Sequence, residues 1–388
     1  MKNVRLGIIG LGNMGAAHAR TVLEGKAPGL ELAAVADRNA DKRALFPEVP
    51  GYETPEALIA SGEVDAVLIA TPHYSHTTIG CSALEAGLHV MVEKPISVHK
   101  ADCEKLIAAW RARRGRRRPV FAAMFNQRTD PFYRKIRELV QRGEIGRVQR
   151  INWIITTWFR PEVYYSMGGW RATWAGEGGG VLLNQCPHNL DLLQWIFGMP
   201  ARVHAHCGFG RYHAIEVEDD VTAYLEFTDG ATGVFIASTG EAPGTNRLEV
   251  AGDRGRLVYE NERLVFTRNE VPVSEFSRTT DAMFGKPATW EVTFPELSGH
   301  GGQHVEILRN FADAIRHGAE LIAPAAEGIH SVELANAMLL SAWTGRMVEV
   351  PIDAAAYARR LRRKIRESKP RSGPVRRTGP VDLSGSFS

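Results

Sequence analysis

The sequence predicts an α/β protein with two parts: a doubly wound parallel sheet, then an α+β domain with a large, mostly antiparallel sheet. Apolar runs alternate with helical segments in the first part, and a glycine-rich turn follows the first run. Short turns join the later β-rich runs. Strands that alternate with helices indicate a parallel sheet. We expect the first domain over 1–127, the second over 128–356, and a basic, partly disordered tail over 357–388.

Five short apolar runs in the first part are typical of buried parallel strands. They are Val4–Ile9, Leu30–Ala36, Val64–Ala70, Leu88–Val92 and Val120–Phe125. An alanine-rich helix should follow the glycine turn, and further helices should run from about Thr77 to Ala86 and from about Lys100 to Arg113. In such a sheet, ligands bind at the carboxyl ends of the strands.

The second part begins with a long β-rich run, Val148–Phe159, and then Gly178–Gly180 opens into a predicted helix, Leu182–Phe197. Further strands are expected at Arg202–Phe209, Val221–Phe227, Thr232–Ser238, Arg247–Ala251, Arg256–Tyr259 and Leu264–Thr267. Short turns between these strands favour an antiparallel or mixed sheet. Two helices should follow, near His304–His317 and Gly328–Trp343.

The composition, with 44% hydrophobic residues in 388, suits one large or two medium globular domains. We expect no membrane span, because no run of about 18 apolar residues occurs, and no secretory segment before the first strand. Four cysteines without metal-ligand spacing favour a reduced, cytoplasmic chain.

The net charge is only +3, but two basic runs, 111–118 and 359–377, carry +6 and +9, so the rest of the chain is acidic. Neither run is interleaved with aromatic residues or lies in a nucleic-acid-binding motif. A solvated helix end and a frayed tail therefore explain them better than nucleic-acid binding.

The turn Gly10-Leu11-Gly12-Asn13-Met14-Gly15 follows a predicted strand and opens a predicted helix. Glycine at these spacings allows a tight turn and a close approach to a pyrophosphate, which the helix N-terminus attracts. We therefore expect 1–127 to be an NAD(P)-binding Rossmann domain. Asp37, at the end of the second strand, suits the ribose hydroxyls of NAD, although a helix cap is its structural alternative. Arg38 beside it suits a 2′-phosphate and leaves NADP open.

Two further segments carry candidate catalytic groups. Lys94 ends a predicted parallel strand, so its ammonium should lie in the ligand crevice and donate to an oxygen that becomes a carbonyl. His188 has an ordinary pKa suited to proton transfer. On a helix, Asn184 and Asp191 would be its i−4 and i+3 neighbours. A helix that begins at Pro187 would instead place His188 in the first turn. The structural alternatives are a solvated loop lysine and a buried core histidine.

These segments resemble the Gfo/Idh/MocA oxidoreductase family. The resemblance is carried by GLGNMG (10–15), AVADR (34–38), ATPHYSH (70–76), EKPIS (93–97), GGWR (168–171) and GGGVLLNQCPHNLDLLQWIFG (178–198). It implies an NAD(P)-dependent dehydrogenase or reductase that acts on CH–OH groups, assembled as a homodimer or homotetramer. Besides the glycine turn, Asp37 and Arg38, the cofactor contacts implied are Ala70, Thr71, Pro72, His73, His76, Glu93, Lys94, Pro95, Asn126 and Arg171.

The catalytic set that the resemblance implies is Lys94, His188, Asn184 and Asp191. Asn184 is a departure, because many members of the family carry Asp there. An amide can hold a hydroxyl or orient His188, but it cannot share a proton. A mechanism that uses a carboxylate–histidine pair at these positions is therefore in doubt.

An aromatic and cationic stretch should contact the substrate, because aromatic faces and guanidinium groups suit sugar rings and hydroxyls. Its members are Trp158, Arg160, Trp170, Arg171 and Trp174. The tryptophans would suit a core or a subunit interface equally well. His73 and His76 lack further ligands in the sequence pattern, so no metal is expected.

The sequence predicts hydride transfer between a nicotinamide and a secondary hydroxyl of a sugar, glycoside or cyclitol. Two alternatives keep the fold: a non-catalytic dinucleotide-binding regulator, and a glycosidase that oxidises its substrate transiently and regenerates its NAD. The presence of both Lys94 and His188 argues against the regulator, which needs neither.

Overall fold

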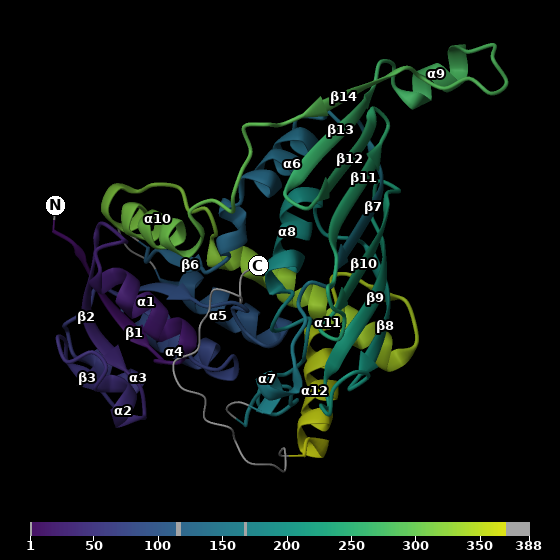
Figure 1. The fold of residues 1–388 in the computed structure, drawn as a ribbon. Coiled ribbons are helices and arrows are strands. Elements are labelled where there is room, and N and C mark those ends of the chain that lie inside the picture. Colours follow the sequence, from purple (N-terminus) through teal and green to yellow (C-terminus); the bar gives the residue numbers. More distant parts are fainter. Residues whose placement is uncertain (1, 114–117, 167–168, 370–388) are drawn as a thin grey trace.

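The chain contains two sheets with separate hydrophobic cores (Figure 1). The computed structural model describes residues 2–113, 118–166 and 169–369. Within these ranges the first sheet has six strands and the second has nine. This architecture confirms the predicted fold class.

The six-stranded sheet is parallel, with the order β3-β2-β1-β4-β5-β6. Its strands are β1 (Val4–Ile9), β2 (Leu30–Ala36), β3 (Gly51–Tyr52), β4 (Ala66–Ile69), β5 (His89–Val92) and β6 (Phe121–Ala123). The order reverses between β1 and β4. Connections leave this point in opposite directions, which opens a ligand crevice at the carboxyl edge of the sheet.

The helices of this part connect consecutive strands. They are α1 (Asn13–Leu23), α2 (Ala40–Arg43), α3 (Pro55–Ala60), α4 (Tyr74–Glu85) and α5 (Lys100–Ala112). Side-chain caps fix several starts: the Thr54 hydroxyl accepts from the backbone N–H of Ala57 ahead of α3. Gly12 precedes α1 without a side-chain cap, so this helix start is left open for a ligand.

A late segment of the chain returns to the first sheet. Helix α10 (Gln303–His317) buries Leu308 and Phe311 in the same core as β1 and β2. Figure 1 shows α10 beside the N-terminal sheet, away from the nine-stranded one. The first domain therefore includes residues that we expected within 128–356, because the apolar stripe of a helix does not specify which sheet it will cover.

The nine-stranded sheet has the order β14-β13-β12-β11-β7-β10-β9-β8-β15. Its strands are β7 (Val148–Ile155), β8 (Arg202–Phe209), β9 (Glu218–Glu226), β10 (Thr232–Ser238), β11 (Asn246–Gly252), β12 (Gly255–Glu260), β13 (Arg263–Asn269), β14 (Thr289–Thr293) and β15 (Val348–Glu349). β7 and β10 pair in parallel, and the other neighbours in the described sheet are antiparallel. The sheet is thus mostly antiparallel, as predicted.

Helices cover one face of this sheet, and in Figure 1 α6, α8 and α11 all lie on that side. The remaining described helices of the second half are η1 (Asn126–Thr129), α6 (Pro131–Gln141), α7 (Glu162–Ser166), α8 (Pro187–Phe197), α9 (Val273–Thr279), η2 (Ala325–Glu327), α11 (Gly328–Thr344) and α12 (Ala354–Glu367). In β7, buried Ile151, Trp153 and Ile155 alternate with partly exposed residues. This alternation is the pattern of a sheet that is covered on one face.

The helix predicted over Leu182–Phe197 begins only at Pro187. Residues 181–186 form turns, and Pro187 occupies the first helical turn, where its missing N–H costs nothing. Asn184 therefore precedes the helix and is not an i,i+4 neighbour of His188. His188 lies in the first turn, which was the alternative left open.

The C-terminal helix α12 begins before residue 357, where we expected the tail to start. Asp353 caps it by accepting from the backbone N–H of Ala356, and Tyr357 and Leu361 are buried in the second core. Residues 370–388 of the predicted tail, and 114–117 of the first basic run, lie outside the described residues. None of the described helices has the length and apolar character needed to cross a membrane.

Candidate active site at the carboxyl edge of the parallel sheet

The three glycines of the turn after β1 have different surroundings. A Cβ on Gly15 would lie 1.8 Å from the Gly10 carbonyl oxygen, and a Cβ on Gly10 would lie 2.8 Å from that of Ala70. A Cβ on Gly12 would meet nothing within 4 Å. Gly10 and Gly15 are thus required for packing, whereas Gly12 faces open space at the uncapped start of α1. This cradle, with the backbone N–H groups of Asn13 and Met14, fits a pyrophosphate.

Asp37 is held at the end of β2 and points toward the glycine turn. Its Oδ2 accepts from the backbone N–H of Leu11 at 2.8 Å, and its Oδ1 accepts from that of Asn39 at 2.9 Å. Asn39, not Asp37, caps α2. The carboxylate stays partly exposed and is therefore available to ribose hydroxyls. Lys42 lies 3.6 Å away and Arg38 is exposed beside it, so positive charge for a 2′-phosphate is also present.

The loop after β4 adjoins the glycine turn through Ala70, and Thr71 and Pro72 follow it. His76 is fully buried, and its two ring nitrogens lie 2.7 Å from the Thr71 carbonyl oxygen and 2.9 Å from that of Pro95. His76 therefore links the loops after β4 and β5 and does not line the crevice. The other histidine of this segment, His73, lies with its Nδ1 3.4 Å from the Glu177 carbonyl oxygen.

Glu93 is an internal anchor for the loop after β5. Its Oε1 lies 2.6 Å from Nε2 of His18, and its Oε2 accepts from the backbone N–H of Lys94 at 3.1 Å. Burial disfavours the charged carboxylate, but the hydrogen bond and charge of His18 outweigh burial and lower the pKa of Glu93 to about 2. The carboxylate of Glu93 is thus paired with His18. The peptide bond from Lys94 to Pro95 is cis.

Lys94 extends from the end of β5 toward the segment before α8. Its Nζ donates to the backbone carbonyl of Asn184 at 2.8 Å. Burial lowers the pKa of Lys94, and the neighbouring Glu93 opposes that effect. The ammonium therefore lies in a low-dielectric environment, where its charge acts strongly on a nearby oxygen.

His188 is buried in the first turn of α8 with its ring edge-on to Phe125. Its Nδ1 has no hydrogen-bond partner among the described residues. Burial, and then the charge of Lys94, lower the pKa of His188 well below its usual value, so the imidazole is neutral and able to accept a proton. The structure thus brings Lys94 and His188 together, although 93 residues separate them in the sequence.

Asp191 does not pair with His188, which was one of the partners considered for it. It is fully buried, and both of its oxygens accept from Arg128, from Nε and Nη2 at 2.7 Å each. Arg128 also donates to Glu327 at 2.6 Å. This two-bond ion pair joins α8 to the segment after β6, so its role here is structural.

Replacing Asp191 with asparagine should therefore reduce stability more than chemistry. The change leaves a buried guanidinium without its main partner, which should lower the free energy of unfolding by about 3–5 kcal/mol. Denaturant unfolding of both proteins measures this loss. A large fall in turnover with unchanged stability would contradict the structural role.

The loop after β6 contributes a buried polar atom. Asn126 donates from Nδ2 to Gln303 at the start of α10, whereas its own Oδ1 has no partner among the described residues. A buried acceptor without a donor is costly unless a ligand or water satisfies it. Asn126 was expected to contact the cofactor, and its free oxygen is compatible with that expectation.

The predicted substrate residues divide into two groups. Trp158 is buried and donates from Nε1 to Asn189 of α8, so it supports the helix. Arg160 and Arg171 both stack on Tyr164, at 5.4 and 4.6 Å from the ring centre, and Trp170 packs edge-on against His73. The arginines of the second group lie near Lys94, because their charges act on it. Gly168 of the GGWR motif lies outside the described residues.

Two residues of this site were missed in the sequence: Tyr164 and Glu177. The Tyr164 hydroxyl accepts from Arg171 at 2.7 Å and donates to Oδ1 of Asn184 at 3.3 Å. Glu177, only 2% exposed, accepts from the Asn184 amide group. For Glu177, the one signal available in the sequence was its position directly before the glycines at 178–180.

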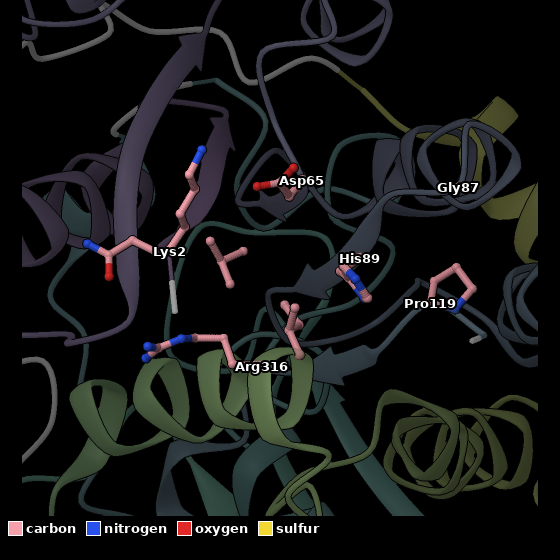
Figure 2. Close-up of a pocket in the computed structure, with 9 residues that line it drawn as sticks. Lys2, Asp65, Gly87, His89, Pro119 and Arg316 are labelled. Atoms are coloured by element: carbon pink, nitrogen blue, oxygen red, sulfur yellow. The ribbon is translucent and has the colours of Figure 1, made fainter. Parts of the chain in front are cut away.

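A separate pocket lies at the opposite edge of the parallel sheet. Figure 2 shows Lys2, Asp65, His89 and Arg316 among the residues that line it. Its volume is about 420 Å³. Val4 and His89 begin β1 and β5, so this is the amino edge, and Asp65 is already paired with Arg5 at 2.8 Å. This pocket is therefore distinct from the predicted site. The described residues contain no group of three or more His, Cys, Asp or Glu side chains able to hold a metal ion.

Comparisons with known proteins agree with this geometry. Residues 4–118 match the family model of the oxidoreductase family with an NAD-binding Rossmann fold, and 133–258 match the Gfo/Idh/MocA C-terminal domain. Inositol 2-dehydrogenase of Rhizobium meliloti is 26% identical over 89% of this chain and 99% of its own length. Levoglucosan dehydrogenase of Pseudarthrobacter phenanthrenivorans is 25% identical over 90% and 99%.

A solved structure supports the fold. The WlbA dehydrogenase from Bordetella pertussis, in complex with NADH and UDP-GlcNAcA, superposes with a TM-score of 0.74, at 23% identity over 91% of this chain and 100% of that one. The glycine cradle, Asp37 and both family matches are mutually consistent. The chain belongs to the Gfo/Idh/MocA family and is an NAD-binding oxidoreductase.

Proposed function

We propose that this protein transfers a hydride between a nicotinamide cofactor and a secondary hydroxyl of a sugar, glycoside or cyclitol. The observation that carries the proposal is the meeting of Lys94 with a buried, neutral His188 at the carboxyl edge of the parallel sheet. The names of the relatives, an inositol and a levoglucosan dehydrogenase, support this substrate class.

The residues of the chain would divide the reaction among them. The glycine turn and α1 would hold the pyrophosphate, and Asp37 the adenosine ribose. When bound, the nicotinamide supplies the hydride acceptor for oxidation or the hydride donor for reduction. The Lys94 ammonium donates to the substrate oxygen and stabilises negative charge on it, while the His188 imidazole accepts the hydroxyl proton during oxidation.

A panel of polyols, assayed by absorbance of the reduced nicotinamide with NAD and with NADP, tests this proposal. Turnover of at least one sugar or cyclitol is expected. NADH binding without turnover on a broad panel would favour the regulator instead. Release of sugar from glycosides without net NADH formation would favour the glycosidase.

We also propose that the chain forms a homodimer or homotetramer through the uncovered face of its nine-stranded sheet and the segment that projects beyond β13. Partly exposed Ile154, Val234 and Ile236 lie together on that face. Beyond β13, the segment with α9 projects from the sheet (Figure 1), and Met283 and Phe284 on it are 87% and 90% exposed. Apolar surface of this kind is typical of subunit contacts.

Light scattering on the full chain tests this association. At micromolar concentrations, the expected molar mass is two or four times 42.8 kDa. Phe284→Ser should shift that mass toward the monomer, because it removes the most exposed large apolar side chain among the described residues. A wild-type protein that remains a 42.8 kDa species would contradict the proposal.

We further propose a cytoplasmic location. The cysteines Cys81, Cys103, Cys186 and Cys207 are all free thiols, which persist in reducing compartments. Fractionation of the host cell would test this proposal, and recovery from an oxidising compartment would contradict it.

A further inference from the structure

We propose that Glu177 is a positioning residue of the active site, and that its carboxylate replaces the one that this chain lacks at position 184. The inference rests on the proposed function. Glu177 accepts a hydrogen bond from the side-chain amide of Asn184. The backbone carbonyl of Asn184 in turn accepts from Nζ of Lys94 at 2.8 Å. Glu177 is therefore linked to the lysine through one residue.

The carboxylate of Glu177 has a fixed place and orientation. It is buried, and its second oxygen accepts from the backbone N–H of Ala172 at 2.7 Å. Its own backbone N–H donates to Thr173 at 2.9 Å. The chain then turns sharply at Gly178, where a Cβ would lie 2.2 Å from the Val98 side chain. This close packing holds Glu177 toward the active site.

Glu177 also determines which way the Asn184 side chain points. The carboxylate can only accept, so it faces the NH₂ group, and the Asn184 oxygen is left to face the Tyr164 hydroxyl at 3.3 Å. Arg171 donates to the same hydroxyl at 2.7 Å. The amide is thus fixed at both ends, four residues before His188. An amide with one defined orientation can present a consistent contact to a substrate hydroxyl.

The charge of Glu177 also acts on Lys94. Burial lowers the pKa of Lys94, and Arg171 and Arg160 lower it further, whereas Glu93 and Glu177 raise it. Glu93 is already committed to His18. The other titratable groups that interact with the charge of Lys94 are the imidazoles of His73, His188 and His304 and the thiol of Cys186.

Loss of the Glu177 charge would therefore leave a buried lysine facing two guanidinium groups, with Glu93 as the remaining carboxylate that acts on it. Burial raises the pKa of Glu177 itself, and the charge of Arg171 opposes this effect. Without the Glu177 charge, the pKa of Lys94 would fall, and its uncharged form would become populated at a lower pH. An uncharged amine polarises the substrate oxygen less strongly, so activity should fall as pH rises.

Exchange of the two side chains gives the decisive experiment, with three variants: Glu177→Gln, Asn184→Asp and the double variant. Glu177→Gln should lower kcat/KM by about tenfold at a pH above the pKa of Lys94 in both proteins, because a smaller fraction of the amine is protonated in the variant there. The basic limb of its pH profile should move to lower pH. Asn184→Asp alone should also lose activity, since it places two carboxylates in contact.

The double variant restores one carboxylate and one amide in exchanged order. It should recover kcat/KM to within about threefold of wild type, which is well inside the tenfold loss expected of Glu177→Gln. Glu216→Gln is the matched control, because Glu216 accepts from the backbone N–H of Trp174 but belongs to no part of this network. That control should keep wild-type activity. A double variant no more active than Glu177→Gln would overturn the proposal.

A second measurement does not depend on turnover. Competitive labelling of amines with acetic anhydride, followed by mass spectrometry, gives the pKa of Lys94 in the protein without added cofactor. Glu177→Gln should lower that pKa and leave the labelling of surface lysines such as Lys105 unchanged. An unchanged Lys94 pKa would overturn the proposal. Wild-type protein that turns over no polyol would instead reject the proposed function, while the labelling still decides the role of Glu177.

Folding of each variant is checked by thermal melting and by NADH binding. If Glu177→Gln fails to fold, the double variant decides the matter, because it retains a carboxylate within the pair. Recovery of both folding and the Lys94 pKa in the double variant supports the proposal. Recovery of folding without recovery of the Lys94 pKa contradicts it.

Discussion

Replacing His188 with alanine should lower kcat by about a hundredfold or more and leave the affinity for NADH almost unchanged, because the change removes the general base. Its buried Nδ1 has no partner among the described residues, so the imidazole has no evident structural bond to lose. Steady-state kinetics and NADH fluorescence titration measure the two effects. Equal turnover in the variant would remove His188 from the base role.

The role of His188 as the base also predicts how kcat depends on pH. Burial and the charge of Lys94 lower the pKa of His188, so its neutral form persists to a lower pH than that of an ordinary histidine. In the oxidation direction, the acid limb of kcat should lie below pH 6.5, the usual pKa. His317→Ala, at an exposed position near the end of α10, is the matched control and should change neither rate nor profile.

Elements with strong local signals were predicted accurately from the sequence. Val4–Ile9, Leu30–Ala36 and Thr232–Ser238 match observed strands at both ends, because a buried strand needs an apolar run that ends where the chain turns. The two-residue strands β3 and β15 carry no such run and were missed. Their pairing depends on neighbours that lie far away in the sequence.

The placement of α10 and α12 shows a different limit. The helix near His304–His317 was predicted, but its apolar residues pack in the first core. Helix α12, which packs in the second core, was not predicted. An amphipathic pattern predicts that one face of a helix is buried, but it does not specify which sheet or core that face contacts. Domain boundaries drawn along the chain therefore assigned α10 to the wrong sheet and cut α12 at 357.

The candidate site was predictable where a residue type has few alternatives. Glycine at 10, 12 and 15 and a lysine after β5 have specific roles at the carboxyl edge of a parallel sheet. The partners of Asp191 and Asn184 were not predictable, because Arg128 and Glu177 reach them only through the tertiary fold. The pairing of Asp191 with Arg128 also shows that a carboxylate at helical spacing from His188 need not face it.

The glycine turn yields the other large effect, and two single-methyl changes should separate its two roles. Gly15→Ala places a Cβ 1.8 Å from the Gly10 carbonyl oxygen, so α1 must move away from β1. Such overpacking costs about 1–3 kcal/mol or more, and it should lower the melting temperature and abolish NADH binding together. Gly12→Ala meets no atom within 4 Å and has a φ of −70°, which alanine adopts without strain.

Gly12→Ala should therefore melt like the wild type and yet bind NADH at least about tenfold more weakly, a loss of about 1.4 kcal/mol. Its methyl group would occupy the space where the pyrophosphate approaches the start of α1. Calorimetric titration with NADH and thermal melting of the protein without added cofactor distinguish the two variants. If Gly12→Ala bound NADH as tightly as the wild type, the cofactor would have to approach the sheet elsewhere than over this turn.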